Sequence, residues 1–385
     1  MIGVRNQVLF TLVIVAAAAV AASGFVGYAP NRLVSGRPIA LWVAVNGPLG
    51  AAVALLGAAL LALCFMRPDS IILYLEASLA TALLLLVLAA AGDAASGFAH
   101  GAKPAARISL GGAFWVLAAC AVLAVIDALQ RLGAGAAMQV FIVVGIGVGV
   151  CGLAAAGAFD ALSLAREYAI RRGVFAEAVL RHVALVAGSV WPAIAIGFPL
   201  GVAAVRRPGL QSPLFAVLNM LQTIPSIALF GLLIIPLAAL AAAVPPLAAL
   251  GVGGIGVAPA IVALVLYALL PIVRNTVAGL TGVDAAVIDA ARGMGLTSGQ
   301  VFRGVELPLA LPVFLAGLRI VTVQAIGLAV VAALIGAGGL GTFVFQGLGQ
   351  YAVDLVLLGA VPAILLALAA NFVLQTLSAV LRPAR

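Results

Sequence analysis

Runs of about twenty consecutive apolar residues recur along this chain, and they decide what can surround it. An α-helix of about twenty residues is just long enough to cross the hydrocarbon core of a bilayer. The sequence is 66% hydrophobic and only 8% charged, whereas a soluble domain is about one quarter charged. Segments of alternating polarity, which build membrane β-barrels, do not recur. The sequence therefore predicts an all-α integral membrane protein.

Ten apolar runs are long enough to be membrane spans, five on each side of a more polar segment at 160–182. The first run lacks a small-residue cleavage site before a soluble region, so we expect a retained helix and not a cleaved signal peptide. The expected spans are residues 7–29, 39–66, 70–91, 108–129, 137–159, 184–204, 213–238, 257–280, 313–336 and 353–380.

The change of composition at 160–182 predicts a division of the chain. Residues 1–159 are expected to form an N-terminal membrane extension of about five helices, with few polar groups. Residues 160–182 are expected to form an amphipathic connector. Residues 183–385 carry nearly all of the motif-like sequence, including a charged stretch at 281–312.

The net charge of +8 comes from basic residues that lie mostly between the apolar runs. There they fix topology and contact anionic headgroups, so the charge does not indicate nucleic-acid binding. With the expected spans, every arginine after residue 182 falls on one side, which the positive-inside rule makes the cytoplasm. These are Arg206, Arg207, Arg274, Arg292, Arg303, Arg319, Arg382 and Arg385. The 281–312 loop is thus predicted to be cytoplasmic, although the same parity places the arginines of 160–182 outside.

Residues 281–312 are predicted to begin with a short amphipathic helix. Asp284 can accept hydrogen bonds from the first turn of a helix that begins near Ala285. Val287, Ile288 and Ala291 recur at helical spacing and predict an apolar stripe. Two glycines, Gly293 and Gly295, are expected to end this helix and turn the chain.

A second short helix is predicted after the glycine bend. Thr297 and Gln300 have the spacing of a capping box. Val301, Phe302 and Val305 are expected to form its apolar face, and Pro308 to end it. The two helices could fit a groove of a partner, with Asp289, Arg292 and Arg303 at the rim. The alternative is an ordinary amphipathic connector that lies on the membrane.

The spacing inside this loop resembles the EAA loop of ABC-importer permeases. Asp289, Ala290 and Ala291 are followed by Gly295, then by nine residues, and then by Val305, Leu307 and Pro308. In that family the loop docks on the ATPase subunit, and the resemblance implies the same role for these positions. Asp289 stands where the family usually has Glu, and Val305 stands where Ile is common.

Further stretches are similar to permease subunits of glycine betaine, carnitine and choline importers, the osmoprotectant-uptake group. They are LNMLQTIPSIALFGLL (218–233), LVLYALLPIVRNTVAGLTGVD (264–284) and ALIGAGGLGTFVF (333–345). The resemblance covers about residues 183–385 and implies a five-helix type I ABC-importer permease core. Longer members of the group carry an additional N-terminal extension like the one expected here.

This resemblance implies the permease subunit of an ATP-driven importer in the bacterial inner membrane, moving an osmoprotectant such as glycine betaine. The implied partners are an ABC ATPase, a second permease chain (identical or paralogous) and a periplasmic substrate-binding protein. The sequence contains no Gly-x-x-x-x-Gly-Lys-Ser/Thr motif, so ATP should be bound and hydrolysed by the partner. No catalytic residue, metal site or cofactor is expected in this chain.

Polar side chains within the expected spans mark a candidate translocation path, since lipid makes unpaired polar groups costly. Pro225 can open a kink and free carbonyl groups to line a cavity. The alternative is that these groups simply form hydrogen bonds between helices. The candidates are Asn219, Gln222, Thr223, Pro225, Ser226, Tyr267, Asn275 and Gln324.

An ion-coupled or passive carrier is the alternative function. It would need intramembrane charges along the path, and before residue 183 the candidates are Glu76 and Asp127. Glu76 could pair with another helix or belong to a separate site, and the sequence does not decide between the two.

Overall fold

The computed structural model describes residues 3–31, 34, 36–103 and 105–381, so Arg382 and Arg385 lie outside the described part. The chain forms two compact units, Met1–Ile170 and Arg171–Arg385. In the described part, eight helices are long and apolar enough to cross a membrane, and two further apolar helices are shorter. The prediction of an all-α membrane protein with about ten such helices is confirmed.

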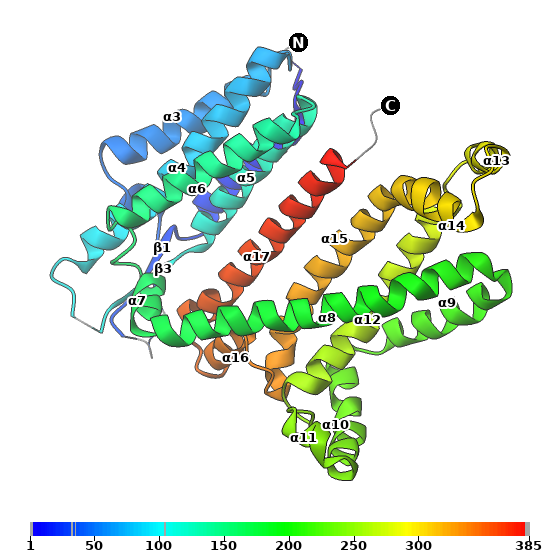
Figure 1. Ribbon diagram of the computed structural model, residues 1–385. Helices are drawn as coiled ribbons and strands as arrows, with labels where there is room; N and C mark the ends of the chain where they lie inside the picture. Colours follow the sequence, from blue (N-terminus) through cyan, green and yellow to red (C-terminus); the bar gives the residue numbers. More distant parts are fainter. Residues whose placement is uncertain (1–2, 32–33, 35, 104, 382–385) are drawn as a thin grey trace. The chain divides into compact units, whose positions relative to one another are not determined.

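The N-terminal unit is a group of up-and-down helices with a small sheet at one end (Figure 1). Its helices are α1 (Gln7–Ala22), α2 (Leu41–Ala44), α3 (Pro48–Leu63), α4 (Ser70–Ala99), α5 (Gly112–Arg131), α6 (Ala136–Ala155) and α7 (Ser163–Ile170). Its strands are β1 (Val26–Ala29), β2 (Arg37–Ile39) and β3 (Arg107–Leu110), in the antiparallel order β2-β1-β3.

The sheet was not predicted, and it shortens two expected spans. The run at 7–29 divides into α1 and β1, and the run at 39–66 divides into α2 and α3 around Gly47, whose φ is +77°. Glycine permits the close approach at the root of the sheet, because a Cβ on Gly111 would lie 2.1 Å from the Gly24 carbonyl oxygen. An apolar run alone does not reveal such a strand, since its residues are equally suited to a helix.

The C-terminal unit contains the remaining spans and their connections. Its elements are α8 (Arg172–Arg206), α9 (Pro208–Thr223), α10 (Ser226–Ala243), α11 (Pro245–Ala249), α12 (Val257–Thr281), α13 (Ala285–Gly293), α14 (Ser298–Val301), the π-helical turn η1 (Phe302–Glu306), α15 (Leu307–Val331), the 3-10 turn η2 (Ala332–Ile335), α16 (Gly341–Gly349) and α17 (Val353–Val380). Two of them differ from the expectation. Residues 172–182 are the first turns of α8 and not part of a separate connector, and the run at 213–238 is broken before Pro225 into α9 and α10.

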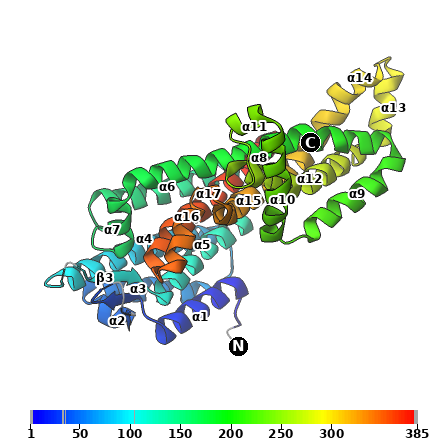
Figure 2. The same cartoon turned by 90° about the horizontal axis from the view of Figure 1, so that it is seen from below.

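Helix α12 is the centre of the C-terminal unit and packs mainly against α8 and α15. Figure 2 shows α9 beside α8 and α12. Small residues let these helices approach closely, as is usual where lipid and side chains are equally apolar. A Cβ on Gly197 would lie 2.8 Å from Ile272, and a Cβ on Gly201 would lie 2.6 Å from Thr276. The α8–α12 contact therefore depends on glycine at two successive turns of α8.

Candidate functional site

The charged loop begins as the sequence predicts. The Asp284 carboxylate accepts a hydrogen bond from the Ala286 N–H at 2.9 Å and caps α13. The helix ends at Gly293, and Gly295 follows with a φ of +85°, a conformation that favours glycine. Helices α13 and α14 extend beyond the ends of α12 and α15 (Figure 1). Residues 281–312 are named the coupling loop here, after the role that the resemblance implies.

The predicted apolar stripe of α13 is only partly buried. Ala291 is 2% exposed and Ile288 is half-buried, whereas Val287 is 43% exposed. Asp289 and Ala290 lie on the exposed side. The Arg292 guanidinium lies 3.6 Å from the Asp289 carboxylate, and both side chains are exposed, so this pair contributes little to stability.

The second helix of the coupling loop differs from the prediction in its end. The Thr297–Gln300 capping box is present, with the Thr297 N–H donating to the Gln300 side chain at 2.8 Å. Helix α14 does not stop at Pro308, however. It passes through the π-turn η1 directly into α15, and Pro308 lies in the first turn of that helix. A proline is tolerated there, because the wider turn before it changes the hydrogen-bond pattern that proline would otherwise break.

A partly buried ion pair joins the coupling loop to α8, and the sequence did not reveal it. The Arg206 guanidinium at the end of α8 donates to both carboxylate oxygens of Glu306, one of them at 3.3 Å. The Glu306 side chain is 7% exposed and the Arg206 side chain 45%. Arg206 also lies over the Phe302 ring, 5.5 Å from its centre. Glu306 is an acidic residue within the apolar stretch Val305–Pro308, and this was the signal that the sequence offered for an ion pair. Its partner, Arg206, could not be predicted because it is one hundred residues away.

A pocket of about 210 Å³ opens beside this ion pair. It is lined by Val205, Arg206, Leu280, Ala285, Ile288, Asp289, Arg292 and Glu306. Asp289 of the EAA-like sequence and Arg206 at the end of α8 both line this pocket, so the two residues lie near each other. The other loop positions are Val305 and Leu307, which are half-buried, and Pro308, which is exposed.

Two of the candidate path residues, Gln222 and Tyr267, make reciprocal hydrogen bonds where α9 and α10 meet α12. Pro271 cannot donate to the Tyr267 carbonyl group one turn earlier, and the Gln222 side chain donates to that carbonyl instead at 2.6 Å. In return the Tyr267 hydroxyl donates to the Ile224 carbonyl beside the break at Pro225. The Tyr267 carbonyl lacks a donor because of Pro271, the Ile224 carbonyl lies at the break between α9 and α10, and each of them accepts from a side chain of the opposite segment.

The other candidates lie elsewhere on these helices and on α15. Asn219 accepts from Arg274 at 3.3 Å beside a pocket of about 400 Å³ between α9 and α12. Thr223 and Asn275 donate to carbonyl groups of their own helices, those of Met220 and Pro271. Ser226 opens α10 and Gln324 lies on α15, both half-buried. The structure therefore brings Gln222, Tyr267 and Pro225 together, and it places the others on α9, α10, α12 and α15 without a common contact.

Comparisons with known proteins cover both units. Residues 193–385 match the family described as the binding-protein-dependent transport system inner membrane component. The chain belongs to this permease family. Residues 4–165 match the N-terminal domain of the ABC transporter permease YehY. The permease is thus a multi-pass inner-membrane transport component, and its family implies a separate ATPase partner, as the resemblance did.

Curated relatives of this permease match about half of its length. It is 43% identical over 211 residues to the osmoprotectant import permease protein OsmW of Salmonella typhimurium, covering 55% of this chain and 93% of that protein. It is 41% identical to the carnitine transport permease protein OpuCB of Listeria monocytogenes, covering 53% and 86%. A solved structure of the MetNI methionine ABC transporter, in inward-facing conformations, is 26% identical, with a TM-score of 0.49 and coverage of 55% and 98%.

Proposed function

We propose that the ATPase docks on the coupling loop and drives this permease by moving α15 and α8 together. The observation that carries the proposal is the Arg206–Glu306 pair within the continuous α14–η1–α15 segment. The loop is attached to α15 through the chain itself and to α8 through this partly buried ion pair. A displacement of the loop would therefore be transmitted to two spans at once, as alternating access requires.

The exposed residues of α13 suit a shallow groove on the ATPase. Ala290 is exposed and has a short side chain, so a partner can approach the helix closely. Met294, one turn later, is 75% exposed and offers an adaptable apolar side chain at the tip of the loop. Asp289 and Arg292 supply charges at the rim. In this arrangement apolar contact supplies affinity, and the rim charges orient the partner.

We propose a small quaternary ammonium osmoprotectant, such as glycine betaine, as the substrate. Support comes from the relatives, which include a glycine betaine/carnitine/choline transport system permease protein of Bacillus subtilis, 36% identical over 221 residues. Tight capture of such a cation needs an aromatic cage. The Tyr267 ring, which belongs to the candidate path, is buried with 6% of its surface exposed, so its face is not open to a cation. High-affinity capture is therefore assigned to a periplasmic binding protein, and two permease chains, identical or paralogous, would enclose a weakly selective path.

The docking proposal is tested with the complete importer expressed from its own subunits. Ala290→Arg adds bulk to an exposed position, and we expect loss of ATPase co-purification and of ATP-dependent uptake, with the permease still folded. Leu250→Arg is the matched control, since Leu250 is 80% exposed and lies outside the coupling loop. Retained ATPase binding by the Ala290→Arg permease would refute docking at this surface.

The substrate is tested separately in the same system. Radiolabelled glycine betaine, carnitine and choline should each be tested for ATP-dependent uptake that requires the binding protein. If the ATPase binds as expected and none of the three is transported, the substrate assignment fails while the docking proposal stands.

A further inference from the structure

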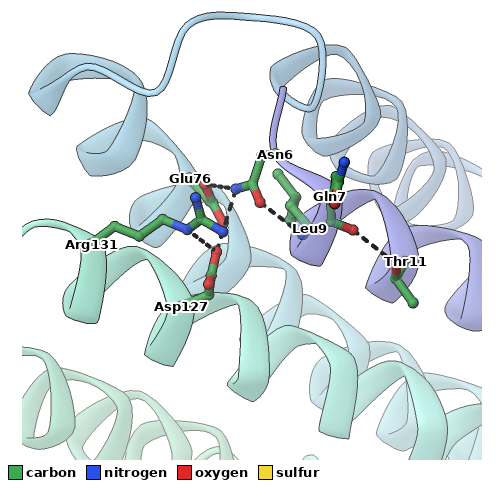
Figure 3. A network of polar contacts seen from close by, with 7 residues as sticks. All are labelled: Asn6, Gln7, Leu9, Thr11, Glu76, Asp127 and Arg131. Atoms are coloured by element: carbon green, nitrogen blue, oxygen red, sulfur yellow. Dashed lines mark hydrogen bonds and ion pairs between the residues drawn. The ribbon is translucent and has the colours of Figure 1, made fainter. Parts of the chain in front are cut away.

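Polar side chains from three separate helices meet at one end of the N-terminal unit (Figure 3). Glu76, in the second turn of α4, is 1% exposed, and Asn6, which caps α1, is 2% exposed. The Asn6 side-chain nitrogen donates to Glu76 Oε2 at 3.1 Å and to Asp127 Oδ2 of α5 at 3.4 Å. One amide group thus bridges two carboxylates from different helices.

The orientation of the Asn6 amide is fixed by its own helix. Its Oδ1 accepts the Leu9 N–H at 3.1 Å as the cap of α1, so the amino end must face the carboxylates. The backbone N–H groups of Arg5 and Asn6 donate to the Cys64 carbonyl group at the end of α3, at 2.9 and 3.1 Å. Two helix ends, the start of α1 and the end of α3, therefore hold the donor in place against Glu76.

The charges around Glu76 do not balance if both carboxylates are ionised. Asp127 is paired with Arg131 one turn away, at 2.8 Å. The other group near Glu76 is the Cys64 thiol, which donates to the Leu60 carbonyl at 3.3 Å. Helix α6, which also packs on α4, has no charged residue. Among the residues that the structure describes, Glu76 therefore has an amide donor on one oxygen, and the cation nearby, Arg131, is bonded to Asp127 instead.

The second carboxylate oxygen of Glu76 gives a separate observation that the charge of this group is not compensated. Oε1 is buried and has no hydrogen-bond partner among the residues that the structure describes. A carboxylate in this position would be an uncompensated buried charge, which membrane proteins avoid by pairing or by neutralisation. No group of three His, Cys, Asp or Glu side chains that could hold a metal ion is found in the described part of the chain. A proton on this oxygen would remove the charge without any further ligand.

We propose that Asn6, Glu76 and Asp127 form a proton-binding site, with the proton on Glu76 and with Asp127 ionised beside Arg131. The proton occupies Oε1, and Oε2 then accepts from Asn6 as a neutral carbonyl oxygen. Proton exchange with water takes place at the edge of the cluster, where the Arg131 side chain is 34% exposed. The proton allows α1, α4 and α5 to pack together at this end of the unit.

Infrared spectroscopy of the full-length permease in lipid nanodiscs tests the proposal directly. A protonated carboxyl group gives a C=O stretching band that a carboxylate lacks. We expect this band at neutral pH in the wild type and in the control Asp69→Asn, and its loss in Glu76→Gln. Asp69 is an exposed carboxylate that caps the same helix, and Asn can replace it as a cap. A wild type without the band, or a band that survives in Glu76→Gln, overturns the proposal.

Thermal stability as a function of pH provides a second readout. The wild type and Asp69→Asn should lose stability as the pH rises and the proton leaves Glu76, whereas Glu76→Gln should lose this pH dependence. Because Gln resembles the protonated side chain, a Glu76→Gln permease that fails to fold contradicts the proposal. Recovery of stability at high pH by sodium or potassium, but not by choline, would identify a metal-cation site and also overturn it.

Discussion

Breaking the Arg206–Glu306 pair from each side should have unequal effects. Glu306 is the buried partner and Arg206 the half-exposed one. Arg206→Met keeps the packing on Phe302 but leaves a buried carboxylate without its cation, which costs about 3 kcal/mol. Glu306→Gln leaves a neutral acceptor, and Arg206 can turn to water, so we expect a cost of about 1 kcal/mol.

The double variant distinguishes this reasoning from simple loss of packing. Adding Glu306→Gln to Arg206→Met removes the stranded charge, so it should recover about 1–2 kcal/mol instead of costing more. For a unit of this size that corresponds to about 2–8 °C in melting temperature. Thermal unfolding of the purified permease in detergent measures the four proteins side by side. A double variant no more stable than Arg206→Met would show that no uncompensated charge was present.

Three further changes test individual contacts. Gly341→Ala should destabilise the permease by about 2 kcal/mol or more in thermal unfolding, because the added Cβ would lie 1.9 Å from the Val330 carbonyl oxygen; an unchanged melting temperature would contradict this close approach. Tyr267→Phe should cost about 1 kcal/mol in the same assay, since the Ile224 carbonyl loses its donor, and a neutral result would mean that another donor replaces it. Asp284→Ala should speed amide hydrogen exchange within α13 by about fivefold, from about 1 kcal/mol of lost capping, whereas Asp284→Asn should not; equal rates would argue against the cap.

The sequence predicted best where a single local interaction decides the structure. The Asp284 cap and the Thr297–Gln300 capping box depend on residues two or three positions apart, and both are present. The EAA-like spacing likewise led to the correct family. Long apolar runs gave the membrane-spanning character, because hydropathy alone determines it.

The sequence did not predict the features that depend on contacts between residues far apart in the chain. Gly24 and Gly111 are far apart in the chain, so nothing local revealed the sheet that they allow. Glu306 finds its cation on α8, and Glu76 finds its amide on α1. Pro308 was misread for a different reason: the rule that proline ends a helix assumes a regular α-helix before it, and the π-turn removes that assumption.

The continuity through this π-turn changes how a push on the coupling loop would act under the proposed mechanism. A helix that ended at Pro308 would leave a flexible joint before α15, and much of the displacement would be lost there. With α14, η1 and α15 joined end to end, a movement at the loop must rotate or shift α15 itself. The π-turn is the widest part of this segment, and Glu306 at its end is held to α8 by Arg206. The segment would then pivot at the Arg206–Glu306 ion pair. The geometry of this pair, more than its strength, would set how far α8 and α15 move.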